Sequence, residues 1–370
     1  MQRLIFDLPI NGVSFGQVST DLLREAFSRD LDCAIFPLNE KMDLNTQNLN
    51  PKENENDQKF LQWLSSSAGK VAEGYDSNTP CFKLWHLNKA SFSSYSNRQF
   101  LMTFHELNQP TKLELAVCNR AEKVIFTSKY SCEVFKAAGA KNVEHIPLGF
   151  DKYNFKTLDK KYFGDDRIVF SLCGKFEHRK NHAKILAAWA KKYGDNKKYY
   201  LNCQLWNPFL DEKQNSACIS RALDNKKYFN INFLGFLQKN SLYNDFLNSA
   251  NIVIGMSGGE GWGLPEFHSV ALGKHGVIMN AHSYKDWAND QNSVLVEPSG
   301  MKPVYDGVFF NEGNATNQGE IFDFDEDQFI AGCEEAIKRY KENPVNENGL
   351  KLQEEFSTSK TLDRILEVTQ

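Results

Sequence analysis

The chain has 370 residues with a formal net charge of −4, and 41% of the residues are hydrophobic. This length suggests two domains with ordinary cores, and the acidic balance argues against a general binder of nucleic acids or acidic membranes. No apolar run approaches the roughly 20 residues of a membrane span, and the first residues, MQRLIFDLP, show no signal-peptide pattern. The eight cysteines never form CxxC, so we expect reduced, buried thiols in a cytoplasmic protein without integral membrane association.

The first half of the chain alternates short apolar runs with segments of helical period. RLIFDLP and DCAIFPL are typical of strands, and QVSTDLLREAFSRD between them has apolar residues at helical spacing. The polar run 39–58 predicts an exposed loop or insertion. Further strands and helices are predicted in alternation by FLMTF, TKLELAVCNRA, KVIFTS, KYSCEVFKAAG and VEHIPL.

The second half repeats this alternation after 148–166, a segment without a clear period that is the best candidate linker. Strand–helix alternation in both halves predicts an α/β protein with two doubly wound parallel sheets. We place an N-terminal Rossmann-like domain at 1–155 and a C-terminal one at 156–349, facing a central cleft. The final helix, about 350–370, is expected to pack back on the first domain. The predicted elements of the second half are RIVFSLCG, NHAKILAAWAKKYG, YYLNCQL, INFLGF, SLYNDFLNSA, NIVIGMS, GVIMNAH, NSVLVEP and helical patterns near 325–342 and 350–368.

Four loops that follow strands are the candidate binding loops, because doubly wound sheets bind ligands outside the carboxyl ends of their strands. They are 11–17, 105–110, 175–181 and 258–264, and we expect all four to face one cleft. The first contains Gly16, where a backbone without a side chain can approach a phosphate closely.

The loop in SGGEGWGLPEFHSVALG follows a buried strand, and Pro265 suits the first position of the helix that comes next. The free N–H groups and positive dipole of a helix start favour phosphate. Glu260 in this loop would repel phosphate, but a carboxylate accepts hydrogen bonds from sugar hydroxyls. A nucleotide sugar carries both groups. The alternative interpretation is that Glu260 only caps the helix.

Two further loops carry charged candidates. CGKFEHRKNH places Lys175, Arg179 and Lys180 after a strand of the second sheet, where cations stabilise the charge that a departing nucleoside diphosphate gains. The alternative is a solvated run of charges. LMTFHELNQP places His105 and Glu106 at the end of a strand of the first sheet. A lone histidine is more often structural, but this position favours a functional one.

Taken together, these loops resemble the large family of retaining, GT-B-fold glycosyltransferases that use nucleotide-sugar donors, often called group-one glycosyltransferases. MTFHE and AEKVIFTSKYSCEVFKAAGAKNVEHIPLGFD are similar to the family's passage across the end of the first domain. CGKFEHRKNH resembles its donor loop, and NFLGF through SGGEGWGLPEFHSVALGKHGVIM resembles its donor segment with two glutamates. The resemblance is good over 100–155 and 167–298, fair over 1–38, and poor over 39–99 and after 300.

The resemblance implies a catalytic role for three residues. Glu260 matches the glutamate that contacts donor-sugar hydroxyls, Lys180 the diphosphate lysine, and His105 the histidine near the reacting sugar. The remaining matched residues are expected to bind the donor at its phosphates, sugar or nucleobase: Gly16, Lys175, Arg179, Leu237, Gly261, Trp262, Gly263 and Leu264.

Two positions depart from the family pattern. His268 stands where the family has its second glutamate, which holds the donor ribose, so either His268 or the neighbouring Glu266 is expected to bind ribose. Lys175 replaces an arginine, and a point charge is not equivalent to a bidentate guanidinium.

The implied activity is transfer of a hexose or pentose from a UDP- or GDP-linked donor to an acceptor hydroxyl with retention of anomeric configuration. The resemblance implies front-side substitution without a metal, a cofactor or a protein nucleophile. Asp323, Asp325 and Asp327 contain a DxD pattern, but they open a helical run and predict an acidic helix start.

The acceptor is left open by the sequence: a glycan, a lipid-linked sugar, a protein or a hydroxylated DNA base. We expect it to dock on the N-terminal domain, and nucleic acid is a partner only as acceptor. The alternative function is a nucleotide- or glycan-binding protein of the same fold with weak or no turnover.

Overall fold

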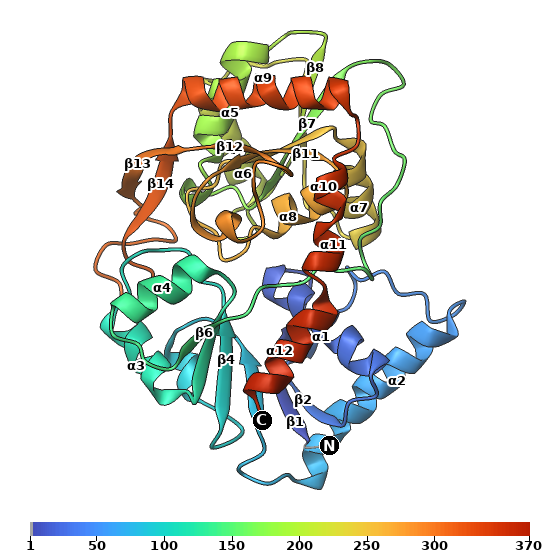
Figure 1. Cartoon of the computed structure of the whole chain (residues 1–370), viewed down its shortest axis with the longest axis vertical. Helices are drawn as coiled ribbons and strands as arrows, with labels where there is room; N and C mark the ends of the chain where they lie inside the picture. Colours follow the sequence, from blue (N-terminus) through green and yellow to red (C-terminus); the bar gives the residue numbers. More distant parts are fainter. Residues whose placement is uncertain (1–2) are drawn as a thin grey trace.

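A computed structural model of the chain describes residues 3–370 (Figure 1). Two α/β domains are stacked along the long axis of the molecule, and the chain passes from the first to the second through the irregular stretch 146–167. Within the described residues, no helix has both the length and the apolar character that crossing a membrane requires. All eight cysteines are free and seven are buried, which confirms the predicted thiols.

The first domain is built on a six-stranded parallel sheet with the strand order β2-β1-β3-β4-β5-β6. The order changes direction between β1 and β3, which makes this the switch point of the sheet. Its strands are β1 (Leu4–Ile10), β2 (Cys33–Met42), β3 (Cys81–Leu84), β4 (Gln99–Thr103), β5 (Lys123–Phe126) and β6 (Val143–His145), and its helices are α1 (Ser14–Ser28), α2 (Glu55–Gly69), α3 (Lys112–Arg120) and α4 (Lys129–Ala137), with short 3-10 helices η1 (Lys70–Glu73) and η2 (Lys89–Phe92).

Both faces of the first sheet are covered, because successive side chains of a strand point to opposite faces. Phe6, Phe82 and Met102 belong to the core that contains residues of α1 and α2. Leu101 and Val124 pack instead with residues of α3 and α4. The near-continuous apolar strands in the sequence follow from this double burial.

The second domain has a six-stranded parallel sheet in the order β12-β11-β10-β7-β8-β9, which is the Rossmann order with its switch point between β7 and β10. These two sheets confirm the predicted fold class. The strands are β7 (Ile168–Gly174), β8 (Tyr199–Leu205), β9 (Ile231–Leu234), β10 (Ile252–Gly255), β11 (His275–Met279) and β12 (Val294–Val296), and the helices are η3 (His178–Lys180), α5 (His182–Tyr193), α6 (Glu212–Ala222), α7 (Asn240–Ser249), α8 (Leu264–Ala271), η4 (His282–Asp286) and α9 (Glu326–Glu342).

An antiparallel hairpin of β13 (Pro298–Pro303) and β14 (Glu320–Phe324) extends from the second domain, and the sequence did not predict it. The loop between its strands reaches α3 of the first domain (Figure 1). Thr111 donates a hydrogen bond to the carbonyl of Ala315, and the main-chain N–H of Asn317 donates to Glu114. The hairpin therefore links the two domains at one edge.

The C-terminal segment returns to the first domain through α10 (Glu347–Leu350), α11 (Leu352–Glu355) and α12 (Thr358–Val368). The predicted continuous helical pattern over 350–368 is wrong at one point, because Phe356 and Ser357 lie against Phe150 and interrupt it. The N–H of Phe150 donates to the carbonyl of Phe356 at 2.6 Å. Beyond this break, α12 packs against α1.

The predicted exposed loop 39–58 is also wrong in part. Thr46 and Gln47 are buried, because both bind Gln17 on α1 and the carbonyl of Thr46 accepts a hydrogen bond from Asn240 of the second domain. Most of this run is exposed, as predicted, but Thr46 and Gln47 use their polar groups for contacts within and between the domains.

Candidate active site

The four predicted binding loops meet where the carboxyl ends of the two sheets face each other. The rings of Phe15 and Phe104 lie 4.2 Å apart in the first domain. A Cβ placed on Gly261 of the second domain would lie 2.6 Å from that of Phe104, and Arg179 lies 3.8 Å from the carboxylate of Glu106. The four predicted loops therefore meet at the boundary between the two domains, and their role in binding stays a prediction.

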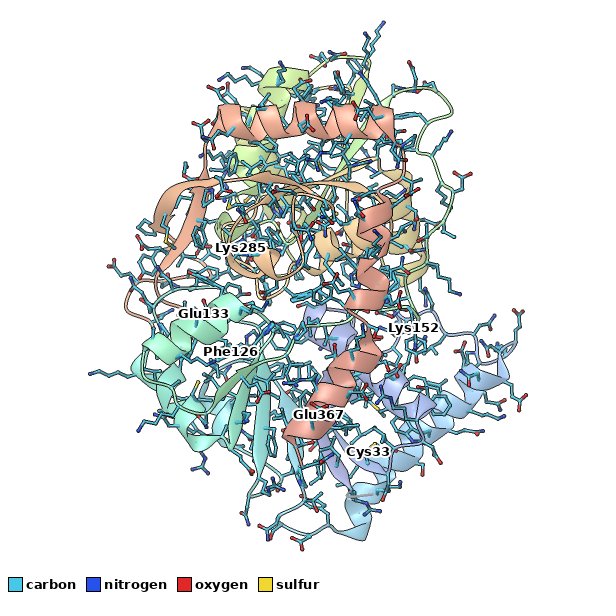
Figure 2. The ribbon with its side chains drawn as sticks, viewed as in Figure 1. Cys33, Phe126, Glu133, Lys152, Lys285 and Glu367 are labelled. Atoms are coloured by element: carbon cyan, nitrogen blue, oxygen red, sulfur yellow. The ribbon has the colours of Figure 1, made fainter. Side chains whose placement is uncertain are left out.

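The two domains are held together beside this cleft. Thr127 donates a hydrogen bond to the carbonyl of Gly261 at 2.8 Å, and the N–H of Lys129 donates to Asp286 at 2.9 Å. Figure 2 shows Glu133 of α4 and Lys285 of η4 on the two sides of the boundary, where these elements are in contact. The loop before α8 is therefore pressed against the first domain.

Glycines let this loop pass through a very narrow space. A Cβ on Gly258 would lie 2.5 Å from the carbonyl oxygen of Phe322. A Cβ on Gly259 would lie 2.7 Å from the carbonyl oxygen of Glu106. Gly263 has φ +82°, in the left-handed region that favours glycine. Only backbone fits at these positions, so main-chain groups line this part of the cleft.

Glu260 lies at the centre of a buried charge cluster. Its carboxylate is 2.5 Å from Lys180 Nζ and 3.5 Å from Arg179 Nη1, and each of the three side chains is less than a tenth exposed. Burial alone would raise the pKa of Glu260, but Lys180 and Arg179 outweigh it and hold the pKa well below its usual range. The carboxylate is therefore ionised and accepts hydrogen bonds rather than donating a proton.

A second carboxylate, Glu177, joins the remaining cations and was missed in the sequence. It lies 2.6 Å from Arg179 and 2.7 Å from Lys175, and the attraction of these cations outweighs burial and lowers the pKa of Glu177. Its place two residues from each cation was the available signal. Lys175 is 32% exposed, and its ammonium lies over the ring of Phe309 at 4.9 Å, so it is the cation most open to a ligand.

His268 is buried in an aromatic environment. Its ring lies 4.3 Å from that of Phe155 and 5.5 Å from that of Phe150, and the N–H of Asp151 donates to its Nε2 at 3.5 Å. Burial lowers the pKa of His268 to about 3, so the imidazole is neutral. It contacts the stretch that connects the domains.

Glu266 lies nearer the charge cluster. A Cβ on Gly263 would be 3.3 Å from its Oε2. Burial raises the pKa of Glu266 to about 7, with Lys180 lowering it and Glu260 raising it. Of the two residues expected to bind ribose, Glu266 is therefore the one that interacts electrostatically with Lys180 and Glu260.

His105 is buried on the first-domain side of the cleft. Its ring packs edge-on against Phe135 at 4.8 Å, and its Nε2 lies 3.6 Å from Glu114 on α3. The following residue, Glu106, approaches Arg179. The structure thus places the His105 ring among side chains of α3 and α4, and its catalytic role stays a prediction.

Four of the other predicted donor residues contribute mainly main chain or packing. A Cβ on Gly16 would collide with the main chain of Asn11. The Trp262 indole is buried against Phe267, which leaves its main chain for the loop. Leu237 is half-buried in the loop after β9, and Leu264 begins α8.

Sequence reasoning missed His86, an exposed residue that follows β3. Its ring lies 4.5 Å from that of Phe15. Desolvation by the cleft walls lowers the pKa of His86, while the charges of Glu106 and Lys175 act on it in opposite directions. The His86 ring is therefore within range of charged groups from both domains. The apolar run CFKLW just before it was the signal for the unpredicted strand β3.

The predicted acidic helix start is right for Asp325 and Asp327, which lie at the start of α9, and wrong for Asp323, which lies in β14. Asp325 accepts a hydrogen bond from the N–H of Gln328 and caps α9, and Asp323 pairs with Lys184 and Lys302. Across residues 3–370, no group of three or more His, Cys, Asp or Glu side chains is placed to hold a metal ion.

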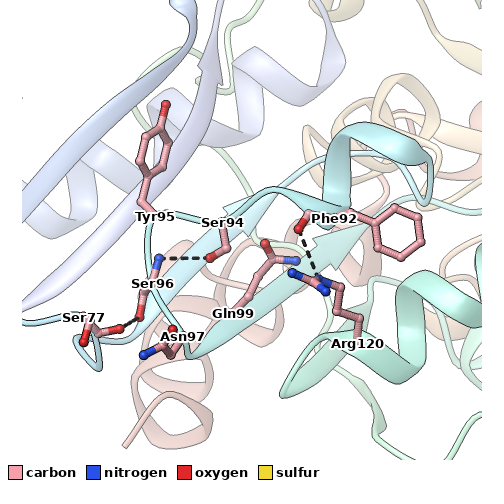
Figure 3. Close-up of a pocket in the computed structure, with 8 residues that line it drawn as sticks. All are labelled: Ser77, Phe92, Ser94, Tyr95, Ser96, Asn97, Gln99 and Arg120. Carbon is pink, nitrogen blue, oxygen red and sulfur yellow. Dashed lines mark hydrogen bonds between the residues drawn. The ribbon is translucent and has the colours of Figure 1, made fainter.

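Two cavities lie outside the cleft. One of about 410 Å³ is lined by Ser94, Tyr95, Gln99 and Arg120 (Figure 3). Gln99 begins β4, so this cavity is at the amino edge of the first sheet, opposite the cleft. Another of about 600 Å³ lies between α4, η4 and α12 and includes His145 in its lining.

No protein-family model and no curated protein sequence matches the chain. Solved structures match it over nearly its whole length. Sucrose-phosphate synthase from Thermosynechococcus elongatus has a TM-score of 0.66 at 14% identity, covering 99% of this chain and 98% of that one. HepE from Anabaena in complex with UDP-glucose gives 0.64 at 14%, covering 99% and 98%. The lipopolysaccharide outer core galactosyltransferase WaaB gives 0.60 at 14%, covering 100% and 99%. This likeness confirms the predicted GT-B fold.

Proposed function

We propose that the protein is a glycosyltransferase that moves a sugar from a nucleotide-sugar donor to an acceptor hydroxyl, with retention and without a metal or other cofactor. The observation that carries this proposal is the buried cluster of Glu260, Lys180 and Arg179 at the switch point of the second sheet. A ligand with an anionic diphosphate beside a neutral, hydroxyl-rich ring complements both signs of this cluster. The named glycosyltransferases of the same fold support it.

Donor binding would rearrange the charge pairing. In the structure Glu260 is the counterion of Lys180. A diphosphate beside Lys180 and Lys175 supplies a stronger counterion, which leaves the Glu260 carboxylate to accept hydrogen bonds from sugar hydroxyls. As the sugar–phosphate bond breaks, the cations stabilise negative charge on the leaving group, and the ionised Glu260 favours positive charge on the sugar ring.

The proposed transfer balances without a protein nucleophile. The bond between the anomeric carbon and the donor phosphate oxygen breaks, and a bond from that carbon to the acceptor oxygen forms on the same face. The acceptor proton passes to the departing phosphate oxygen. The protein then contributes position and electrostatic stabilisation, with His105 proposed to lie near the reacting sugar.

A UDP-linked sugar is the donor to test first, because HepE, with the same fold, is solved with UDP-glucose; GDP-linked sugars come second. The nucleobase is proposed to lie at the loop of Leu237, and the ribose at Glu266 or His268.

The deciding experiment incubates the protein with UDP- and GDP-sugars and measures nucleoside diphosphate release, with and without a pool of acceptors. NMR of the product's anomeric proton tests retention, and EDTA in the assay tests metal independence. If no nucleotide sugar binds or is consumed, the proposal fails.

A nucleotide- or glycan-binding protein without turnover is the second candidate. The observation that favours it is His268, which replaces the family's glutamate and is buried against Phe155 rather than directed at the charge cluster. Tight binding of a nucleoside diphosphate with no sugar transfer to any acceptor would select this candidate.

A further inference from the structure

The first sheet has its own switch point. The proposed donor lies at the switch point of the second sheet, so no ligand is yet assigned to the first. β1 and β3 are adjacent and parallel, while β2 lies on the other side of β1. Loops that leave in opposite directions open a crevice at such a point, and doubly wound sheets bind ligands there. The first residues beyond these strands are Asn11 and Trp85.

Four rings lie together beyond these strands, and we call them the aromatic wall: Phe15, Trp85, His86 and Phe104. Phe15 lies 4.2 Å from Phe104, 4.5 Å from His86 and 5.9 Å from Trp85, measured between ring centroids. Trp85 and Phe104 are half-buried and His86 is exposed. The wall therefore offers aromatic surface and one imidazole to the cleft.

The loop that carries Trp85 and His86 is fixed from beneath. The Ser91 hydroxyl donates to the carbonyl of His86 at 2.6 Å. Lys83, paired with Asp7 at 3.0 Å in the sheet interior, donates to the carbonyl of Ser93 at 3.0 Å. These bonds hold the main chain of the loop, so less freedom is lost when a ligand contacts the rings it carries.

The chemistry of the wall suits an uncharged saccharide. One face of a pyranose ring presents C–H groups, and aromatic faces cover apolar surface of this kind. An imidazole nitrogen binds a hydroxyl. The four rings carry no fixed positive charge, whereas a DNA acceptor needs cations along its phosphates, and the chain's net charge is −4.

We propose that the aromatic wall is the acceptor site, and that it takes a neutral carbohydrate whose ring stacks on Trp85 while one hydroxyl binds His86. This inference rests on the proposed function, since it places the acceptor opposite a donor held by the charge cluster. It adds the acceptor class and two specificity residues that belong to the part of the chain, 39–99, where the family resemblance is poor.

The test measures binding rather than turnover. Methyl α- and β-glycosides of glucose, galactose and N-acetylglucosamine are titrated against the protein saturated with UDP, with saturation-transfer NMR as the readout. Trp85→Ala and His86→Ala are compared with Tyr95→Ala, which removes an exposed ring at the 410 Å³ cavity. UDP affinity and the thermal midpoint of each variant report on folding.

At least one glycoside is expected to bind. Its affinity falls about tenfold in Trp85→Ala, which loses the stacked ring, and about threefold to tenfold in His86→Ala, which loses a hydrogen bond. Tyr95→Ala keeps wild-type affinity, and all three variants keep UDP affinity. Because His86 is exposed, its variant stays informative if Trp85→Ala does not fold.

Two results would overturn the inference while the proposed function stands. In the first, UDP binds but no glycoside does, or a duplex with a hydroxymethylated base binds instead. In the second, a glycoside binds with equal affinity to wild type, Trp85→Ala and His86→Ala. If neither UDP nor any nucleotide sugar binds the wild-type protein, the proposed function itself is wrong.

Discussion

The two walls of the cleft occupy equivalent places in their sheets and differ completely in chemistry. The wall of the second domain has Lys180, Arg179 and Glu260 paired and almost fully buried. The wall of the first domain consists of rings, and its one titratable group, His86, is exposed. A switch point thus supplies a crevice, and the residues after each strand decide whether it selects charge or apolar surface.

The largest expected effect comes from removing a cation of the charged wall, Lys180. Lys180→Met keeps the volume of the side chain but removes the cation that faces the diphosphate, so the turnover number should fall by about 10³. Diphosphate release measures it, and circular dichroism checks the fold. The matched control is Lys184→Met, since Lys184 pairs with Asp323. A wild-type rate in Lys180→Met would remove this residue from the site.

Glu260→Gln should separate binding from catalysis on the same wall. Turnover is expected to fall by about 10², because an amide stabilises positive charge on the sugar less than a carboxylate does. UDP should bind at least as tightly as to wild type, since Lys180 no longer has an internal counterion. Calorimetric titration with UDP provides the measurement, and weaker UDP binding would contradict the proposed exchange of partners.

A smaller effect distinguishes the two ribose candidates. Glu266 lies beside Gly263 and His268 lies against Phe155, so Glu266→Gln should raise the donor KM by about tenfold through the loss of a charged hydrogen bond. His268→Phe should leave the donor KM near wild type. The reverse pattern would assign the ribose to His268.

The smallest expected effect concerns stability in acid. Burial lowers the pKa of His282 to about 4, and its Nε2 lies 2.8 Å from the carbonyl of Ser257 behind the charged wall. Below the unfolded-state pKa, near 6.5, the unfolded chain binds a proton that the folded state does not. Stability from this residue is therefore complete above about pH 6.5 and is lost as pH falls toward 4, by about 1.4 kcal/mol per pH unit.

Urea unfolding of wild type and His282→Asn between pH 5 and 8 checks this slope. Asparagine tolerates the positive φ of 39° at this position. The variant should show a shallower dependence on pH than wild type. Identical slopes would mean that the imidazole is protonated alike in both states.

The sequence predicted the charged wall better than the aromatic one, for a physical reason. Lys175, Arg179 and Lys180 are close together in the chain, and Glu260 lies in one glycine-rich loop, so local patterns reveal them. Phe15 lies in the first turn of α1, while Trp85 and Phe104 follow β3 and β4, and only the strand order brings the three together.

The sequence also did not predict which charged side chains pair with each other. Lys180 and Glu260 were both predicted to face a ligand, yet in the structure each is the other's partner. A pattern of residue types shows which groups gather, but not how they satisfy each other before a ligand arrives. Likewise, the interruption at Phe356 depends on Phe150, some two hundred positions earlier, and no local periodicity contains that information.

The strand-like contact between Phe150 and Ser357 ties the outgoing chain to the returning chain at the boundary of the two domains. Both crossings of the chain run side by side there, and Gly149 is so close to Thr358 that a methyl group would not fit between them. Two further contacts join the domains at other places: Asn240 of α7 donates a hydrogen bond to Gln17 of α1, and the N–H of Glu320 in the hairpin donates to Asn108. Removing the segment from Phe356 onward would leave 146–167 as the one stretch of the described chain that runs between the domains, with the side-chain and hairpin contacts as the remaining links.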